Sequence, residues 1–136
     1  MIVVDTNVIA HLMLPSEHTD LIEQIFAADS DWAAPVLWRS EMRSVLALYL
    51  RKSLVSLGAA GDLLDEAESL MRGREYEVAG RDVLALVDRS SCSAYDCEFV
   101  ALARGLGVRM VSMDRRVLGA FPDIACAPDV FLADKD

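Results

Sequence analysis

The chain opens with a short apolar segment that ends in an aspartate, and the same arrangement returns near its other end. Ile2-Val3-Val4 precedes Asp5, and the run over residues 108–113 precedes Asp114. Short runs of apolar, β-branched residues indicate buried strands. Because parallel strands end at a common edge of the sheet, where open α/β sheets bind ligands, we expect Asp5 and Asp114 to meet there.

Strand and helix patterns alternate along the rest of the chain. This alternation predicts an α/β domain in three layers, with a central, mostly parallel sheet between helices. We expect one domain over residues 1–136, in which about 127–136 form an acidic tail anchored by Val130-Phe131-Leu132. The expected helices cover residues 8–14, 17–28, 35–52, 57–71, 82–89, 94–104 and 117–121, and the other strands cover 32–34, 76–78 and 124–126.

The composition is that of a globular protein with a packed core, since 54% of the residues are hydrophobic. No apolar run is long enough to cross a bilayer, and no basic segment precedes an apolar stretch as in a signal peptide. We therefore expect no membrane association and a cytoplasmic location. The three cysteines have no CxxC spacing, which favours free thiols in a reducing compartment over a zinc site.

The net charge of −9 has the wrong sign for a protein that binds nucleic acid through its overall charge. It has three possible meanings: solubility, a basic protein partner, or clustered carboxylates that hold divalent cations and so reverse the local sign. Composition alone does not choose among them.

Two further carboxylates occupy positions that face the core. Glu41 shares a helical stripe with Trp38 and Val45, and Asp96 heads the apolar face that Phe99 and Val100 continue. An unpaired buried carboxylate is costly, so it needs a partner, a raised pKa or a metal ion. Each acid also has a simpler explanation.

Those simpler explanations are local. Glu41 would form a salt bridge with Arg39, Arg43 or a more distant arginine. Asp96 would favour the positive end of its helix, which Ser93 is placed to cap, and Asp5 would cap the helix that Thr6 and Asn7 begin.

Taken together, the four acids predict a metal site. Asp5, Glu41, Asp96 and Asp114 would converge at the carboxyl edge of the sheet, where their charges repel unless a cation binds. Ligands that are all oxygen select hard cations such as Mg²⁺ or Mn²⁺. Such sites bind phosphates and activate water, so phosphodiester hydrolysis is the natural chemistry. It requires no histidine base, and His11 and His18 both lie near the first helices.

The order and spacing of these motifs resemble the PIN domain, especially the short VapC-type toxins of toxin–antitoxin pairs. The resemblance covers nearly the whole chain and departs mildly at Ser112, where the family usually has threonine. It rests on Val4-Asp5-Thr6-Asn7-Val8, Ser40-Glu41, Ser93-Ala94-Tyr95-Asp96 with Ala101-Leu102-Ala103, and Val111-Ser112-Met113-Asp114-Arg115-Arg116.

The resemblance implies a Mg²⁺- or Mn²⁺-dependent endoribonuclease that a co-expressed antitoxin inhibits and that commonly forms a homodimer. Asp5, Glu41, Asp96 and Asp114 would be the metal ligands and catalytic acids. Thr6, Asn7 and Ser112 would orient the carboxylates or a phosphate. Arg39, Arg43, Arg115 and Arg116 would contact RNA phosphates or form surface salt bridges.

Two other functions remain open from the residues alone. An acidic, non-catalytic interaction module fits the net charge and requires four solvated, independent acids. An Asp-based phosphotransferase would use Asp5 as nucleophile, but such sites need a second acid where Asn7 stands and a lysine after a strand. The only lysines are Lys52 and Lys135, and neither follows a strand.

Overall fold

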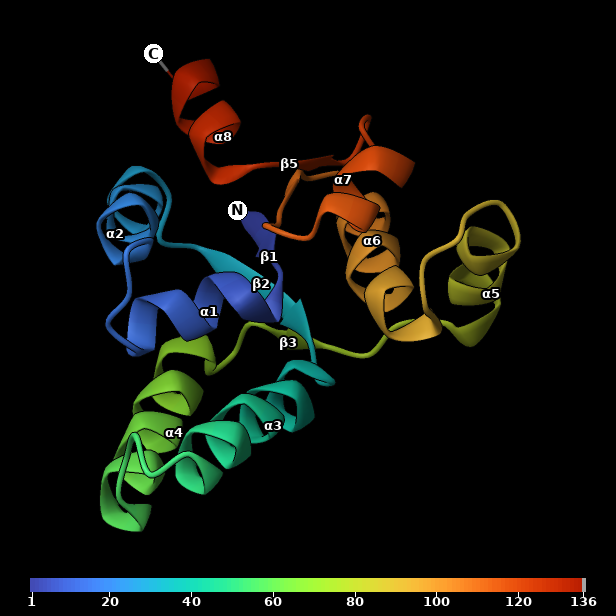
Figure 1. The fold of residues 1–136 in the computed structure, drawn as a ribbon. Helices are drawn as coiled ribbons and strands as arrows, with labels where there is room; N and C mark the ends of the chain where they lie inside the picture. Colours follow the sequence, from blue (N-terminus) through green and yellow to red (C-terminus); the bar gives the residue numbers. More distant parts are fainter. Residues whose placement is uncertain (136) are drawn as a thin grey trace.

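A computed structural model describes residues 1–135, in which strands and helices alternate as the sequence predicts (Figure 1). The strands are β1 (Ile2–Val4), β2 (Trp32–Pro35), β3 (Glu75–Tyr76), β4 (Met110–Val111) and β5 (Ala125–Cys126). The helices are α1 (Thr6–Met13), α2 (Thr19–Ala28), α3 (Trp38–Arg51), α4 (Leu57–Met71), α5 (Gly80–Asp88), α6 (Ala94–Leu106), α7 (Arg115–Ala120) and α8 (Pro128–Lys135).

The five strands form one parallel sheet in the order β3-β2-β1-β4-β5. Strand β1 is central, all three of its residues are buried, and Val3 pairs with Met110 of β4. The ladder continues past the strand, because the N–H of Asp5 donates to the carbonyl of Val111 at 3.0 Å. Two aspartates, Asp5 and Asp114, therefore leave the sheet at the same edge, as the repeated strand pattern predicts.

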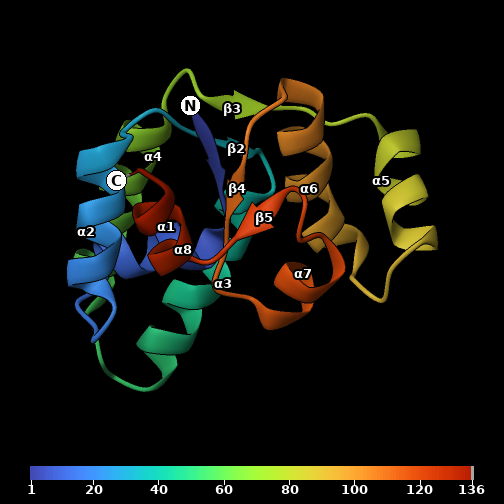
Figure 2. The same cartoon turned by 90° about the horizontal axis from the view of Figure 1, so that it is seen from above.

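Helices cover both faces of the sheet, which confirms the predicted three-layer architecture. Figure 2 shows α1, α2, α4 and α8 on one side of the strands and α5, α6 and α7 on the other. Helix α6 packs on β1, β2 and β4. The core includes Trp32, Trp38 and Phe99, all almost fully buried, so the centre of the sheet is covered on both faces.

Short-range hydrogen bonds fix where the helices begin at the carboxyl edge. Ser93 caps α6 as expected, because its hydroxyl accepts a hydrogen bond from the N–H of Asp96 at 3.0 Å. Asp5 and Asp114 cap α1 and α7 through their own side chains. Helix α6 ends at Leu106 and is followed by Gly107, whose φ of 67° favours glycine. These caps hold three of the four acids at helix starts.

The C-terminal segment differs from the expected acidic tail. Residues 128–135 form α8, which begins at Pro128, a favourable residue for a first helical position, and packs against α2. Of the three expected anchors, Phe131 is buried whereas Val130 is exposed. The final residue of the expected tail, Asp136, lies outside the described residues.

The described helices include none that is both long and apolar enough to cross a membrane. The three cysteine thiols are free, as the sequence predicts, and all three are buried.

A candidate active site at the carboxyl edge of the sheet

A cavity of about 530 Å³ opens at the carboxyl edge of the sheet and brings the four predicted acids together. Its walls come from the start of α1, one face of α3, and the first residues of α6 and α7. It is lined by Asp5, Thr6, Asn7, Leu37, Ser40, Glu41, Ser44, Val45, Tyr95, Asp96 and Asp114. All four carboxylates thus face one space, although they come from parts of the chain that are far apart in sequence.

Asp5 is the most deeply buried of the four acids, with 8% of its surface exposed. One carboxylate oxygen accepts the N–H of Thr6 at 2.9 Å, and the other accepts the hydroxyl of Ser112 at 2.7 Å. Burial raises the pKa of Asp5 to about 6, the two hydrogen bonds oppose the rise, and the charges of Glu41 and Asp96 add to it. Asp5 therefore has its polar atoms satisfied but its charge uncompensated.

Glu41 lies half-buried on α3 and faces the same cavity. Its Oε1 accepts a hydrogen bond from the hydroxyl of Thr6 at 2.8 Å, in place of the salt bridge that was the alternative interpretation. Burial raises the pKa of Glu41, the bond from Thr6 lowers it, and the charges of Asp96 and Glu98 raise it further. Glu41 thus belongs to the same group of interacting charges as Asp5.

Asp96 and Asp114 are half-buried, like Glu41, and line the same cavity. Oδ1 of Asp114 accepts the N–H groups of Arg116 and Val117 at 2.8 and 3.3 Å, whereas its Oδ2 makes no hydrogen bond within residues 1–135. The carboxylate of Asp96 has neither a hydrogen-bond nor an ion-pair partner among those residues. Both acids therefore keep oxygen atoms available to a ligand.

A hydrogen-bond network ties the ends of β1 and β4 together beneath the acids. Ser112 is fully buried; its hydroxyl donates to Asp5 and accepts the N–H of Asp114 at 3.0 Å. Asn7, in the first turn of α1, accepts a hydrogen bond from the N–H of Met113 through its Oδ1 at 3.4 Å. Ser112 and Thr6 thus contact the carboxylates of Asp5 and Glu41 directly, whereas Asn7 contacts the backbone just before Asp114.

The four arginines expected near the acids are absent from the lining of this cavity. The guanidinium of Arg39 donates to Glu75 at 2.6 and 2.9 Å and lies 3.3 Å from Glu68, so it forms the salt bridge that was its alternative role. Arg43 borders a separate apolar cavity between α3 and α4. Arg115 and Arg116 are exposed at the start of α7, beside Asp114.

Several residues in or near the cavity were given no role in the sequence analysis, although Ser40 and Tyr95 stand in the motifs quoted there. Leu37, Ser40 and Ser44 extend the face of α3 that carries Glu41 and Val45, and their helical spacing was the signal that could have revealed them. Tyr95 precedes Asp96, and Glu98 contributes charge close to Glu41. Nothing local in the sequence distinguishes these side chains from ordinary surface residues.

The residues fit a hard divalent cation that keeps part of its water shell. Among the described residues, no three His, Cys, Asp or Glu side chains stand close enough to enclose an ion by themselves. Mg²⁺ typically binds through one or two carboxylates together with water and substrate phosphate, so a closed cage is not required. The four carboxylates, with the hydroxyl groups of Thr6, Ser40 and Ser44 and the amide of Asn7, supply the oxygen-rich surroundings that such an ion prefers.

The fold is that of a known class of α/β proteins. A sequence model of the PIN domain matches residues 2–124, and the chain therefore belongs to the PIN domain family. This confirms the resemblance recognised from the sequence motifs.

Individual relatives agree with this membership. The chain is 26% identical over 124 residues to Ribonuclease VapC3 of Pyrobaculum aerophilum, covering 89% of this chain and 95% of that protein. PAE2754 from Pyrobaculum aerophilum has the same fold, with a TM-score of 0.74 at 19% identity over 98% of this chain and 94% of that one. FitAcB from Neisseria gonorrhoeae also has this fold, with a TM-score of 0.71 at 19% identity over 94% of this chain and 98% of that one. The structure of FitAB bound to an IR36 DNA fragment has a TM-score of 0.71 at 20% identity over 94% of this chain and 95% of that one.

Proposed function

We propose that this PIN-family protein is a Mg²⁺- or Mn²⁺-dependent endoribonuclease that hydrolyses RNA phosphodiester bonds, and that it is the toxin of a toxin–antitoxin pair. The observation that carries this proposal is the set of four acids around one cavity. The charges of Glu41 and Asp96 raise the pKa of Asp5, that of Asp96 raises the pKa of Glu41, and none of the four has a cation partner within residues 1–135. Its relative in Pyrobaculum aerophilum is named a ribonuclease, which supports the same chemistry.

In this proposal the acids hold the ion and the polar residues beneath them set their orientation. Asp5, Glu41, Asp96 and Asp114 would be the metal ligands, directly or through water. Once bound, the ion would supply charge to stabilise a phosphate and would activate a water molecule. Thr6 and Ser112 would hold the carboxylates of Glu41 and Asp5 by their hydroxyl groups, and Asn7 would fix the loop after β4.

The arginines that remain candidates for RNA contact are Arg43, Arg115 and Arg116, because the guanidinium of Arg39 is occupied by Glu75 and Glu68. Arg115 and Arg116 follow Asp114 directly and are exposed. They could contact the phosphates on either side of the bond that is cut.

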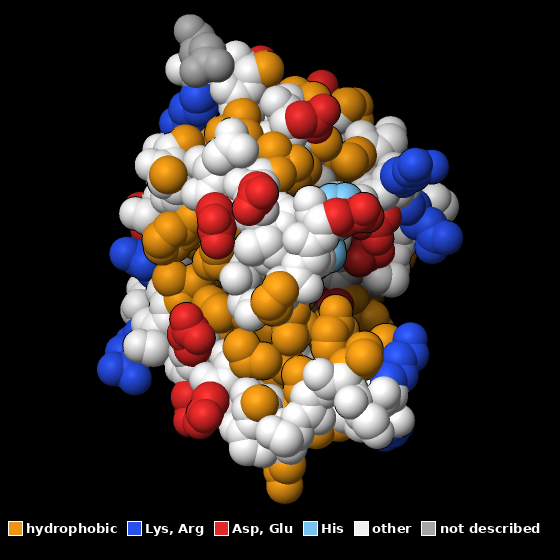
Figure 3. Space-filling model, turned by 60° about the vertical axis from the view of Figure 1, so that its left-hand side comes forward, with side chains coloured by type: hydrophobic (Ala, Val, Ile, Leu, Met, Phe, Trp, Pro, Cys, Tyr) orange, Lys and Arg blue, Asp and Glu red, His pale blue; other side chains and the backbone are white. Residues whose placement is uncertain are grey.

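An antitoxin segment would bind to the helical face formed by α1, α2 and α4. Figure 3 shows hydrophobic side chains gathered on this side of the molecule. A cavity of about 570 Å³ lies there and includes Leu12, Met13, Phe26 and Leu70. Apolar surface of this kind is typical of protein interfaces. A homodimer and a cytoplasmic location remain part of this proposal.

The acidic interaction module fits the site less well. It requires four solvated carboxylates that titrate independently, whereas Asp5 is buried and its pKa responds to Glu41 and Asp96. The phosphotransferase also fits less well, since both carboxylate oxygens of Asp5 already accept hydrogen bonds.

The direct test is cleavage of a panel of structured RNAs by the purified protein, with Mg²⁺, with Mn²⁺ and with a chelator. We expect metal-dependent fragments and a loss of at least about 100-fold in Asp5→Asn and Asp96→Asn, since even residues that only orient metal ligands cost 10–100-fold. Asp31→Asn, at the opposite edge of the sheet, is the matched control and should cleave normally. Cleavage that persists in the chelator would contradict the proposal.

A further inference from the structure

We propose that the cavity beside the acids contains a subsite for one unpaired nucleobase of RNA, with the ring of Tyr95 as its stacking surface. This inference rests on the proposed nuclease function and deepens it, because it assigns how the substrate strand is held next to the acids.

Tyr95 is exposed in a way that the fold does not explain. Of its surface 62% is accessible, and its hydroxyl has no hydrogen-bond partner within residues 1–135. The other two tyrosines, Tyr49 and Tyr76, pack against the core instead. A large aromatic side chain left in solvent at the mouth of a cavity is typical of a binding surface.

The position of Tyr95 places its ring next to the chemistry. It belongs to the first turn of α6, directly before Asp96, and it lines the same cavity as all four acids. A base stacked on this ring would therefore hold its own phosphate and ribose close to the carboxylates.

The part of the cavity lined by α3 offers apolar and neutral polar groups to a flat ring. Leu37, the residue before α3, and Val45 line it on either side of Glu41, and Ser40 and Ser44 lie on the same face of the helix. A nucleobase has apolar faces and a polar edge, so it can pack between Tyr95 and the apolar pair while its edge meets the serine hydroxyls. The volume of about 530 Å³ is within the range of small-molecule sites.

The charge of the cavity favours a base over a phosphate in this subsite. With four carboxylates around it, a phosphate is repelled except where a cation intervenes, whereas a base carries no charge. Base faces are buried in an RNA duplex and accessible only in loops, bulges and single strands. The substrate position is therefore an unpaired nucleotide.

The test compares the binding of single-stranded RNA with that of the same chain lacking bases. All proteins carry Asp114→Asn, which is expected to prevent cleavage, and binding is followed by fluorescence anisotropy in Mg²⁺. The probes are labelled oligoadenylate and oligouridylate of about ten nucleotides and an abasic ribose-phosphate chain of equal length. An oligodeoxyadenylate probe reports whether the subsite prefers ribose.

We expect the parent to bind the oligonucleotides more tightly than the abasic chain, and Tyr95→Ala to lose roughly 5- to 150-fold of that affinity. Tyr95→Phe keeps the ring and should bind as the parent does. Leu84→Ala, which removes an equally exposed apolar side chain on α5, should also leave binding unchanged. Equal melting temperatures would show that each variant is folded.

Binding that is the same in Tyr95→Ala and in the parent would overturn the inference, as would equal binding of the intact and abasic chains. Failure of the proposed function looks different: the native chain would cleave no RNA while the Tyr95-dependent preference for bases persists. If instead the native chain cleaves RNA and Tyr95→Ala does not change the cleavage rate, the proposed base subsite is wrong and the proposed nuclease function stands.

Discussion

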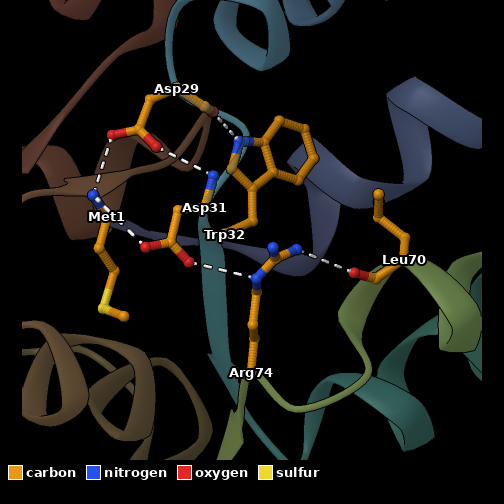
Figure 4. Close-up of polar contacts among 6 residues, drawn as sticks. All are labelled: Met1, Asp29, Asp31, Trp32, Leu70 and Arg74. Carbon is orange, nitrogen blue, oxygen red and sulfur yellow. Dashed lines mark hydrogen bonds and ion pairs between the residues drawn. The ribbon is translucent and has the colours of Figure 1, made fainter.

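The two edges of the central sheet both carry acidic side chains, but within residues 1–135 the acids of the amino edge pair with cations, whereas the four acids of the cavity at the carboxyl edge do not. At the amino edge, Asp29 and Asp31 lie 3.1 and 3.9 Å from the amino group of Met1, and Arg74 lies 3.2 Å from Asp31 (Figure 4). Arg109, just before β4, pairs with Asp134 at 2.9 Å. Acid and cation are balanced there within the chain.

At the carboxyl edge the acids accept hydrogen bonds only from neutral groups. The hydroxyl groups of Thr6 and Ser112 donate to Glu41 and Asp5, and backbone N–H groups donate to the carboxylates of Asp5 and Asp114. Hydrogen bonds satisfy the oxygen atoms but do not remove the negative charge, which remains to attract an ion from solution. The comparison indicates that the amino edge serves stability and the carboxyl edge serves binding.

The largest difference between the two edges should be the pH dependence that Asp5 gives to the free energy of unfolding in metal-free protein. Its pKa in the folded state is about 6, above the ordinary value of 3.8, so between these pH values the folded state holds a proton that the unfolded state has released. The contribution of Asp5 to the free energy of unfolding should therefore be fully present below about pH 4 and fall by roughly 3 kcal/mol as the pH rises through 6, at about 1.4 kcal/mol per pKa unit. Urea unfolding across this range, in a chelator, measures it.

Asp5→Asn should remove the share of Asp5 in this fall of the free energy of unfolding, because the amide does not titrate, while the share of Glu41, whose pKa burial also raises, should remain. Asp31→Asn is the control from the other edge and should keep the wild-type slope. If the free energy of unfolding of wild type and of Asp5→Asn depended on pH in the same way, Asp5 would not be the group responsible. The proposed difference between the two edges would then be wrong for the most buried acid.

A smaller effect is expected from Ser112→Ala. The change leaves Oδ2 of Asp5 and the N–H of Asp114 without their partner, which should cost about 1–3 kcal/mol in the free energy of unfolding. It should also weaken Mn²⁺ binding by about 10- to 100-fold, because the carboxylate of Asp5 is no longer held. Calorimetric titration with Mn²⁺ and chemical unfolding provide the two readouts.

Ser56→Ala separates these two effects, because Ser56 caps α4 far from the acids and its loss should cost about 1 kcal/mol. Unchanged Mn²⁺ affinity is expected for this variant. If both serine variants weakened Mn²⁺ binding equally, lost stability rather than lost orientation would be the cause.

The smallest effect should come from Arg74→Ala at the amino edge. Arg74 and Asp31 are both partly exposed, so their ion pair contributes about 1 kcal/mol at most and less at high salt. Mn²⁺ affinity should not change. Weaker Mn²⁺ binding in this variant would mean that the two edges are coupled, and the division of roles between them would not hold.

Sequence patterns were sufficient for the fold and for the identity of the acids. Repeated strand–aspartate segments located Asp5 and Asp114, since parallel strands end together. Helical spacing identified Glu41 and Asp96 as carboxylates on faces that point inward. Both arguments use periodicity that the chain shows locally.

Tertiary partners were not predictable in the same way. The guanidinium of Arg39 binds Glu75, which lies 36 residues away, so its salt bridge left no local signal. The same is true of the wall that Tyr95 forms with Leu37 and Val45, which depends on how α6 approaches α3. The helical conformation of the C-terminal segment was not predicted, because short helices depend on packing, here against α2, more than on a local sequence pattern.

Thermal unfolding with and without Mn²⁺ tests the central claim most directly, in wild type, Asp96→Asn and Asp31→Asn. At a hundred times its dissociation constant the ion should stabilise wild type and Asp31→Asn by roughly 2.7 kcal/mol and Asp96→Asn by little. Metal-free Asp96→Asn should melt above metal-free wild type, because one repelling charge is gone. Wild type that does not respond to Mn²⁺, with Asp96→Asn simply less stable, would contradict the account.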